Sequence, residues 1–236
     1  MCYSNSSTSS NIQLSERYKK TIPSLLPDSP TFFANAFDFP NWRIITADEE
    51  IQFLRWGLVP FWYKSSDWKK FAVNTLNAQL ENLEEKPSFK HTLKSQRCII
   101  PSTGFFEYQH NGKEKTPFFI YPKNDVIFNM AGIYDYHLDS ATGQKIGTFS
   151  IVTCPANEFM AEIHNTKKRM PLLLSNEDAA NWLKEEKFSI EGWKSLSNSE
   201  FDAHIIDKKI ISSPNPNRQE VQKPFVDSSP KQLGLF

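Results

Sequence analysis

The stretch RCIIPSTGFFEY, residues 97–108, combines the pattern of a short strand with a candidate functional carboxylate. Its short apolar run at Cys98–Ile100 predicts a strand, and the proline and glycine that follow interrupt that strand. Beyond the interruption, the carboxylate of Glu107 stands between Phe106 and Tyr108. Either this segment is a strand of period two with Glu107 pointing to water, or Glu107 is partly desolvated. Desolvation would raise its pKa and suit a general acid or base near neutral pH.

Similar short strand-like runs recur along the chain between glycine and proline clusters. They lie at Trp42–Thr46, Ile51–Leu58, Phe118–Tyr121, Val126–Ile133 and Thr148–Thr153. Helical patterns are confined to Ala78–Leu93, Asn157–Ile163 and Asn176–Glu186. Many short strands with few helices predict an α+β domain. We expect a mostly antiparallel, curled, barrel-like sheet with a few helices packed around it.

The two ends of the chain differ from its middle in composition. Residues 3–15 are rich in serine, asparagine and threonine, which favours a loop over the surface. From Ile211 onward the chain is mostly polar until its last five residues, which is typical of a disordered tail. The sequence therefore predicts one folded domain over residues 2–210 and a disordered tail over residues 211–236.

Charge and cysteine usage limit the class of protein. Lys+Arg and Asp+Glu both number 27, so the formal charge is zero and any nucleic-acid-binding surface must be local. The three cysteines (Cys2, Cys98 and Cys154) show no C-x-x-C spacing. They predict neither a disulfide framework nor a metal site, and they indicate a reducing compartment. Without an apolar run near 18 residues or a secretion signal, we expect a cytoplasmic protein with no membrane partner.

The first two residues, Met1 and Cys2, could carry chemistry of their own. Initiator methionine is generally removed when a small residue follows, which would leave Cys2 with an α-amine and a thiol on adjacent carbons. The amine can condense with an aldehyde to an imine, and the thiol can then close a thiazolidine ring. An α-amine titrates at about 7.7–8.0 and a cysteine at about 8.5, so both amine and thiolate are expected at neutral pH. The alternative is that Cys2 is an accident of the second codon.

Three further segments place functional groups on short turns. Trp56–Pro60 is either a buried strand ending at a proline or part of a binding surface. Asn77 precedes a helical run and is either an N-cap or a site residue. His164 is followed by Lys167, Lys168 and Arg169, which should hold its imidazole neutral as a proton shuttle and would suit phosphates. The alternative for this third segment is an exposed basic loop after a helix.

Together, these segments resemble the SOS-response-associated peptidase (SRAP) family, whose members process abasic sites in DNA. The matching pieces are Cys2, Trp56–Pro60, Asn77-Ala78 with Glu81, Arg97–Pro101, Gly104–Glu107, Ala131-Gly132, His164 with Arg169–Pro171, and Trp182-Leu183. The resemblance runs from residue 2 to about residue 210. It implies that residues 2–210 form an SRAP-like catalytic domain.

The resemblance also implies a role for each matching site residue. Cys2 would be the nucleophile that joins the ring-opened sugar aldehyde of an abasic site. Asn77 would help to place the N-terminus or the sugar, and Glu107 would orient the Cys2 amine and transfer protons. His164 would handle the hydroxyl proton of the sugar during ring opening. These groups are what imine formation and ring closure require, and no cofactor or metal is implied.

Three departures from the family pattern concern the interaction with DNA. Tyr3-Ser4 stand where the family often has Gly-Arg, and Gln79 stands where it usually has arginine. His164 and Arg169 are also further apart than in the common pattern, with Lys167 and Lys168 in the gap. We hypothesise that these lysines take over part of the phosphate binding of the missing arginines. The expected DNA-binding residues are Trp56, Gln79, Lys167, Lys168 and Arg169, with Trp62 and Trp68 as further candidates for stacking on bases.

The end of the chain carries a separate signal, Gln232-Leu233-Gly234-Leu235-Phe236. A glutamine followed by alternating large apolar residues resembles the short peptide by which bacterial proteins dock on the DNA polymerase sliding clamp. Gln232, Leu233, Leu235 and Phe236 would bind the clamp directly. The alternative is a tail that merely ends in apolar residues.

The sequence thus predicts a monomeric, nucleoid-associated protein of the cytoplasm that crosslinks itself through Cys2 to abasic sites in single-stranded DNA. Its activity would be lyase-like on DNA, and the peptidase label of the family refers to the removal of Met1, either by the protein itself or by a methionine aminopeptidase. One alternative is an N-terminal-nucleophile cysteine hydrolase acting on amides. Another is a non-catalytic DNA-binding module associated with the clamp, for which Cys2 would be dispensable.

Overall fold

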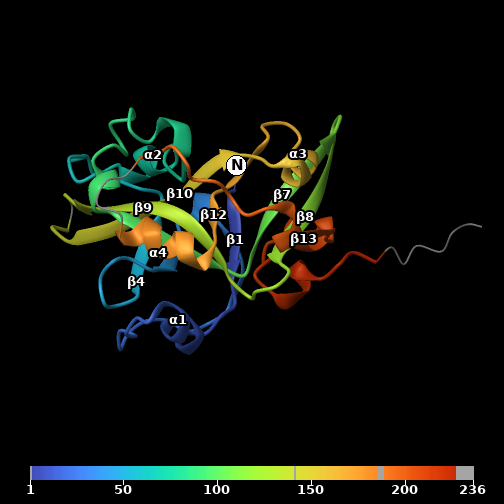
Figure 1. Ribbon diagram of the computed structural model, residues 1–236, viewed down its shortest axis with the longest axis horizontal. Coiled ribbons are helices and arrows are strands. Elements are labelled where there is room, and N and C mark those ends of the chain that lie inside the picture. The colour runs from blue at the N-terminus through green and yellow to red at the C-terminus, as the bar shows by residue number, and fades with distance from the viewer. Residues whose placement is uncertain (1, 141, 185–188, 227–236) are drawn as a thin grey trace, which may run out of the picture.

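The computed structural model describes residues 2–140, 142–184 and 189–226. Two sheets of mostly antiparallel strands form a broadly barrel-like α+β body, and short helices lie around it (Figure 1). This arrangement confirms the fold class predicted from the strand pattern.

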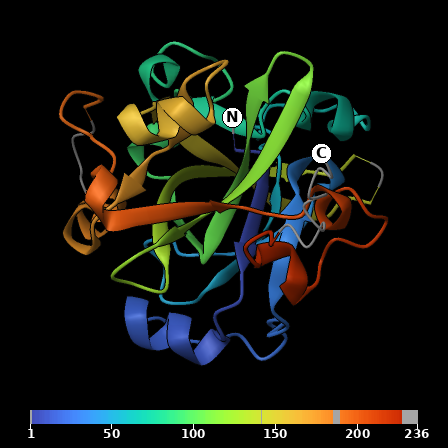
Figure 2. The same ribbon diagram turned by 90° about the vertical axis from the view of Figure 1, so that its right-hand side faces the viewer.

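The first sheet holds the start of the described chain. Its strand order is β13-β8-β7-β1-β2. The strands are β1 (Ser4–Ser7), β2 (Thr31–Asn35), β7 (Gly104–Asn111), β8 (Glu114–Pro122) and β13 (Phe201–Ile205). Figure 2 shows the long β7–β8 hairpin from the side, with β13 running across it. Since β1 lies between β7 and β2, the amino-terminal residues are held on both edges.

The second sheet is built around β9 and β10. Its strands are β3 (Asn41–Ile44), β4 (Gln52–Trp56), β5 (Asn77–Gln79), β6 (Arg97–Ser102), β9 (Phe128–Leu138), β10 (Lys145–Pro155), β11 (Arg169–Pro171) and β12 (Leu173–Leu174). Only the pairs of β10 with β4 and with β5 are parallel among these strands. Near its end, at Thr153, strand β10 pairs with β5 on one edge and with β11 on the other.

The chain passes from one sheet to the other between Ser102 and Gly104, within the stretch 97–108. The hydroxyl of Ser102 donates to the side chain of Asn5 and lies 2.9 Å from the carbonyl oxygen of Gly104, so it ties this corner to β1. A Cβ atom at Gly104 would lie 2.3 Å from the ring of Phe119 and 2.7 Å from the carbonyl of Ile120. The corner thus requires glycine because a neighbouring strand approaches it closely.

The main hydrophobic core lies between the two sheets. Its largest fully buried side chains include Trp56, Phe105, Phe128, Phe149 and Trp182. The indole N–H of Trp182 is 3.1 Å from the carbonyl oxygens of Cys98 and Gly132, which fixes α4 against β6 and β9. A smaller cluster around Phe106 and Val221 covers the other face of the first sheet.

Helices α3 (Glu158–Ile163) and α4 (Asn176–Lys184) confirm two of the predicted helices. The Asn157 side chain caps α3 by accepting a hydrogen bond from the backbone N–H of Met160 at 2.9 Å. The remaining helices are α1 (Asn11–Tyr18), α2 (Trp68–Ala72) and α5 (Lys208–Ile211), with single 3-10 turns at η1 (Ala36–Asp38), η2 (Leu80–Asn82), η3 (Thr92–Lys94), η4 (Asn198–Glu200) and η5 (Gln219–Gln222).

The predicted helix over Ala78–Leu93 is wrong. Asn77–Gln79 form β5, which pairs with Ile151–Thr153, and only η2 and η3 are helical beyond it. Pro87 lies in the middle of the predicted helix, where it lacks an N–H to donate and would clash with the preceding turn.

Residues 3–15 and 211–226 contain more regular structure than their composition predicted. Within residues 3–15, β1 and α1 replace the expected loop, and polar side chains such as Asn5 and Ser6 are buried because they find partners there. Residues 211–226 are mostly exposed, but Ile211 and Val221 are buried and Gln219–Gln222 form η5, so ordered structure continues past residue 210. The predicted division into a domain over residues 2–210 and a tail over residues 211–236 stays a prediction. Residues 227–236 lie outside the described residues.

Among the described residues, no helix is long and apolar enough to cross a membrane.

Candidate functional site

The site begins with Cys2, immediately before β1. Its side chain is fully buried, and its sulfur lies 3.8 Å from the carbonyl oxygen of Ser4. Ser4 pairs with Phe106 in β7, so the antiparallel register brings the residues before Ser4 toward Glu107. The start of β1 lies along one edge of the molecule between α2 and α3, at the top in Figure 1.

Glu107 is buried on β7, with 6% of its surface exposed. The alternative in which this carboxylate points to water is therefore wrong. Burial raises the pKa of Glu107 to about 7. A group with this pKa can both accept and release a proton near neutral pH.

Cys2 and Glu107 interact electrostatically. Burial, followed by the neighbouring Glu107 carboxylate, raises the pKa of the Cys2 thiol far above its ordinary value. The structure thus holds a neutral thiol that interacts electrostatically with a buried carboxyl group whose pKa is about 7. This pKa of Cys2 is that of the thiol in the chain with Met1 attached, so the expected coexistence of amine and thiolate after removal of Met1 stays a prediction.

His164 follows α3 directly and is buried, with 6% exposed. Its Nδ1 lies 2.8 Å from the carbonyl oxygen of Arg169. Burial is the main cause that lowers the pKa of His164, and the charge of Lys167 contributes in the same direction. The imidazole is therefore neutral near pH 7, as the sequence predicted, although burial outweighs the cations.

The loop carrying His164 is attached to the strand that carries Glu107. The amide of Asn165 accepts from the backbone N–H of His110 at 3.0 Å and donates to the carbonyl of His110 at 2.8 Å. Helix α3 also packs against β7. Cys2, Glu107 and His164 are thus all positioned by β7.

Asn77 lines a cavity of about 690 Å³ whose wall also includes Tyr3, the residue after Cys2. Other lining residues are Tyr63, Ser65, Asp67, Lys70, Phe71, Val73, Asn74, Thr75, Leu76, Gln79, Lys86, Ser88 and Phe89. Both the oxygen and the nitrogen of the Asn77 amide are buried without a hydrogen-bond partner among the described residues. Such a group is costly in a folded protein unless a ligand satisfies it, so Asn77 is a candidate for substrate binding rather than a helix cap.

The expected DNA-binding residues are not all at this cavity. Gln79 lines it and accepts a hydrogen bond from Asn82 at 2.7 Å. Trp56 is fully buried and donates its indole N–H to the carbonyl of Leu76 at 2.8 Å, so the expected interaction of Trp56 with DNA is wrong. Trp56 belongs to a mostly apolar segment that ends at Pro60, and this pattern is typical of a buried strand.

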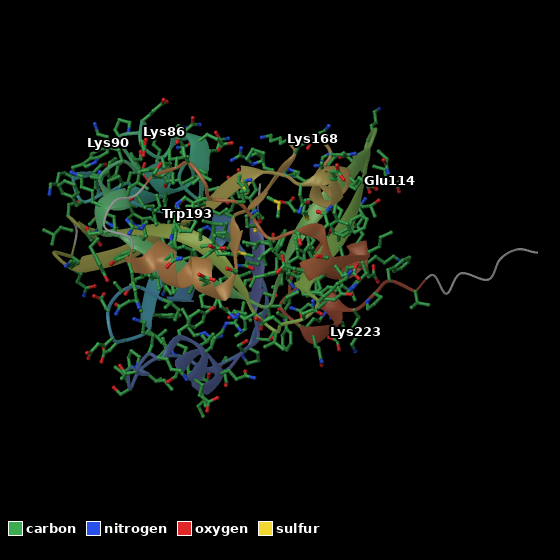
Figure 3. All side chains as sticks on the ribbon, in the orientation of Figure 1. Lys86, Lys90, Glu114, Lys168, Trp193 and Lys223 are labelled. Carbon is green, nitrogen blue, oxygen red and sulfur yellow. The ribbon has the colours of Figure 1, made fainter. Side chains whose placement is uncertain are left out.

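Arg169 is also directed away from solvent. Its guanidinium forms a bidentate ion pair with Glu81 and donates to the carbonyl of Thr153 at 2.8 Å. Its side chain is only 12% exposed, which contradicts the expectation of a cation available to phosphate. Lys167 and Lys168 are exposed, and Lys168 lies on the same edge as Lys86 and Lys90 (Figure 3).

Lys70 and Lys86 were missed by the sequence reasoning, although both line the cavity. Neither forms an ion pair with another residue of the described ranges. Neither lysine belongs to a recognisable motif. Each lies at the cavity because of the way residues 58–96 fold. Trp62 is 41% exposed beside Phe71, whereas Trp68 packs against Phe39 and under the guanidinium of Arg55.

The predicted clamp-binding residues Gln232, Leu233, Leu235 and Phe236 lie outside the described residues. Within the parts of the chain that are described, no three His, Cys, Asp or Glu side chains are grouped so as to hold a metal ion.

These features are those of an α+β protein in which a buried cysteine near the start of the chain interacts with a buried carboxylic acid, and in which the residue after that cysteine, Tyr3, lines a cavity. Residues 1–213 match the family described as SOS response associated peptidase (SRAP), and the chain belongs to this family.

Relatives and solved structures agree with this assignment. The chain is 35% identical over 192 residues to the abasic site processing protein YoqW of Bacillus subtilis, covering 77% of this chain and 82% of YoqW. It is 34% identical over 150 residues to the abasic site processing protein HMCES of Gallus gallus, covering 55% of this chain and 44% of HMCES. A crystal structure of a Bacteroides thetaiotaomicron protein superposes with a TM-score of 0.88 at 37% identity, covering 95% of this chain and all of that one. A Bordetella bronchiseptica protein shares the fold at 17% identity, with a TM-score of 0.74.

Proposed function

We propose that this protein processes abasic sites in single-stranded DNA by joining Cys2 covalently to the sugar aldehyde after Met1 is removed. The observation that carries the proposal is the placement of a buried Cys2 next to Glu107, whose pKa lies at about 7. Family membership and the names of the relatives, abasic site processing proteins, support the choice of substrate.

The chemistry proceeds in two steps, a condensation followed by an addition. The α-amine of Cys2 attacks the aldehyde carbon, and loss of water gives an imine. The thiol then adds across the carbon–nitrogen double bond, so that sulfur bonds to the former aldehyde carbon and the thiol proton ends on nitrogen. The product is a five-membered thiazolidine ring.

Glu107 and His164 supply the proton transfers. Because the Cys2 thiol is neutral, ring closure requires a base, and Glu107 is the adjacent carboxyl group with a suitable pKa. The sugar of an abasic site must open before its aldehyde is exposed, which requires removal of the hydroxyl proton. A neutral His164 can accept that proton.

The cavity beside Tyr3 accommodates the damaged strand. Asn77 presents an amide whose oxygen and nitrogen are both available to a sugar or to the new amine. Lys70 and Lys86 contribute positive charge for phosphates, and the rings of Tyr63 and Phe71 can stack against bases.

Mass spectrometry of the intact purified chain tests the proposal. We expect the wild-type mass to lack Met1 and, after incubation with abasic single-stranded DNA, to increase by the mass of the oligonucleotide less one water. Undamaged DNA and Cys2→Ala should give no adduct. If peptides or amides were turned over and no adduct appeared, the N-terminal-nucleophile hydrolase would be correct instead.

We also propose that Gln232, Leu233, Leu235 and Phe236 dock the protein on the bacterial sliding clamp. The support is the sequence pattern alone, an apolar peptide at the end of a polar segment. A synthetic peptide of residues 227–236 should bind purified clamp, and replacing Leu235 and Phe236 by alanine should abolish binding. Equal binding by the alanine peptide would refute the assignment.

A further inference from the structure

The ion pair between Glu81 and Arg169 joins two segments of the site. Each terminal nitrogen of the guanidinium donates to one oxygen of the Glu81 carboxylate, with Nη2–Oε2 at 2.9 Å. Nη2 also lies 2.8 Å from the carbonyl oxygen of Thr153 in β10. This arrangement lowers the pKa of Glu81, chiefly through the hydrogen bond from Arg169, so the carboxylate is charged at neutral pH.

The partners come from opposite edges of β10. Glu81 lies in η2, directly after β5, the strand that begins with Asn77. Arg169 is the first residue of β11. Both β5 and β11 pair with β10 at Thr153. The ion pair therefore connects the two strands that flank β10 near its end.

The backbone of Arg169 holds His164. Nδ1 of the imidazole is 2.8 Å from the carbonyl oxygen of Arg169 and 3.3 Å from its backbone nitrogen. The shorter of these two distances assigns the proton to Nδ1, which donates to the carbonyl. Nε2 is then the nitrogen that can take a proton from a substrate. The intervening turn is closed by the N–H of Lys168, which donates to the carbonyl of His164 at 2.9 Å.

We propose that Glu81 and Arg169 are positioning residues that hold His164 in its Nδ1–H tautomer and fix its loop relative to the Asn77 strand. This inference rests on the proposed function, in which His164 moves the hydroxyl proton of the sugar. The guanidinium is committed to Glu81 and Thr153, so it orients the site instead of binding phosphate. A bidentate arginine–carboxylate pair suits this task because it fixes the relative orientation of two segments.

The effect of breaking the pair should fall on rate rather than on DNA affinity. In Glu81→Gln, we expect adduct formation at saturating abasic oligonucleotide to slow by roughly tenfold or more, since displacing a reacting group by about 1 Å can cost about 100-fold. Affinity for an undamaged oligonucleotide should stay within about twofold. Glu84→Gln is the matched control, because Glu84 is exposed and forms no ion pair within the described residues.

Two further variants separate positioning from charge. Arg169→Lys keeps the charge but not the bidentate geometry, so it should slow the reaction as Glu81→Gln does. The exchanged pair, E81R with R169E, should recover part of the rate. Nitrogen-15 NMR of the histidine ring, recorded above the pH at which His164 titrates, should show the Nδ1–H tautomer in the wild type and a mixture in Glu81→Gln.

Unchanged rate and unchanged tautomer in Glu81→Gln would overturn the inference. Tighter DNA binding with a steeper salt dependence in the same variant would also overturn it, because Arg169, once released from Glu81, would then be binding phosphate. If the wild type formed no adduct, the proposed function would fail, and the NMR comparison would still decide whether the pair sets the tautomer.

Discussion

The burial of Glu107, which suits it to proton transfer, lowers the free energy of unfolding at neutral and higher pH. Its pKa is about 7 in the folded chain and 4.5 ordinarily, so folding takes up a proton between these values. The unfolding free energy is therefore unaffected below about pH 4.5, falls as the pH rises from about 4.5 to about 7, and levels off above that. One pKa unit corresponds to about 1.4 kcal/mol, so this buried group costs on the order of 3 kcal/mol at about pH 8.

Replacing Glu107 by glutamine should remove this pH dependence. We expect Glu107→Gln to be more stable than the wild type at about pH 8, and no more stable at about pH 4.5, in denaturant unfolding. Its rate of adduct formation should fall by about 10²- to 10⁴-fold, as for loss of a general acid or base. A variant that lost stability at both pH values would show that Glu107 is mainly structural.

Asn77 is a second site residue whose burial costs stability, although its side chain carries no charge. Because its amide has no partner in the described structure, Asn77→Ala should leave the melting temperature unchanged or raise it slightly. Adduct formation should nevertheless slow. Asn74→Ala is the control at the same cavity: its side chain donates to the carbonyl of Lys70 at 3.0 Å, so this variant should lose about 0.5–1.5 kcal/mol. Equal destabilisation by both variants would contradict an unsatisfied amide at residue 77.

At the scale of single elements, the turn between α3 and β11 stores strain. Lys168 has a φ of 47°, in the left-handed region that costs a non-glycine residue roughly 1–2 kcal/mol. This residue belongs to the wider gap between His164 and Arg169 that distinguishes the sequence from the family pattern.

Glycine at residue 168 should relieve that strain. We expect Lys168→Gly to be more stable than Lys167→Gly by about 1 kcal/mol, or about 2–4 °C in melting temperature. Both variants lose one lysine charge and gain one flexible residue, and only residue 168 of the two has a positive φ. Equal melting temperatures would indicate that the turn adopts another conformation in solution.

The sequence predicted correctly those strands and helices whose formation depends on residues close to them in the chain. Strands appeared wherever apolar residues were bounded by glycine or proline, and α3 appeared where Asn157 could cap it. Strand β1 was missed because its buried serines and asparagine depend on partners far along the chain, such as Ser102, Thr103 and Arg43. Strand β5 was missed because its pairing partner is in β10.

For the whole molecule, the sequence motifs indicated which residues belong to the site, but they did not always indicate what each residue does there. Glu107 is buried and His164 neutral, as chemistry suggested. Arg169 looked like a phosphate-binding residue until the fold placed Glu81 against it. Sequence alone also missed Lys70 and Lys86, since a cavity wall depends on how distant segments meet.

A protein with no net charge must hold DNA through local phosphate binding. With 27 basic and 27 acidic residues there is no net field to attract the strand. Lys86 and Lys168 lie along the edge that holds the start of β1, and Lys223 lies well away from that edge (Figures 1 and 3). A strand entering the cavity would thus pass lysines on both sides of Cys2.

We therefore expect the double variants K70Q/K86Q and K167Q/K168Q each to weaken binding of single-stranded DNA. The slope of log affinity against log salt should become shallower by about 0.7 for each phosphate that the variant no longer neutralises. Combining the two pairs should add their effects because they lie on separate segments. Lys223→Gln serves as the control and should change neither affinity nor slope. If only K70Q/K86Q had an effect, the strand would end at the cavity, and the lysines between His164 and Arg169 would not substitute for the missing arginines.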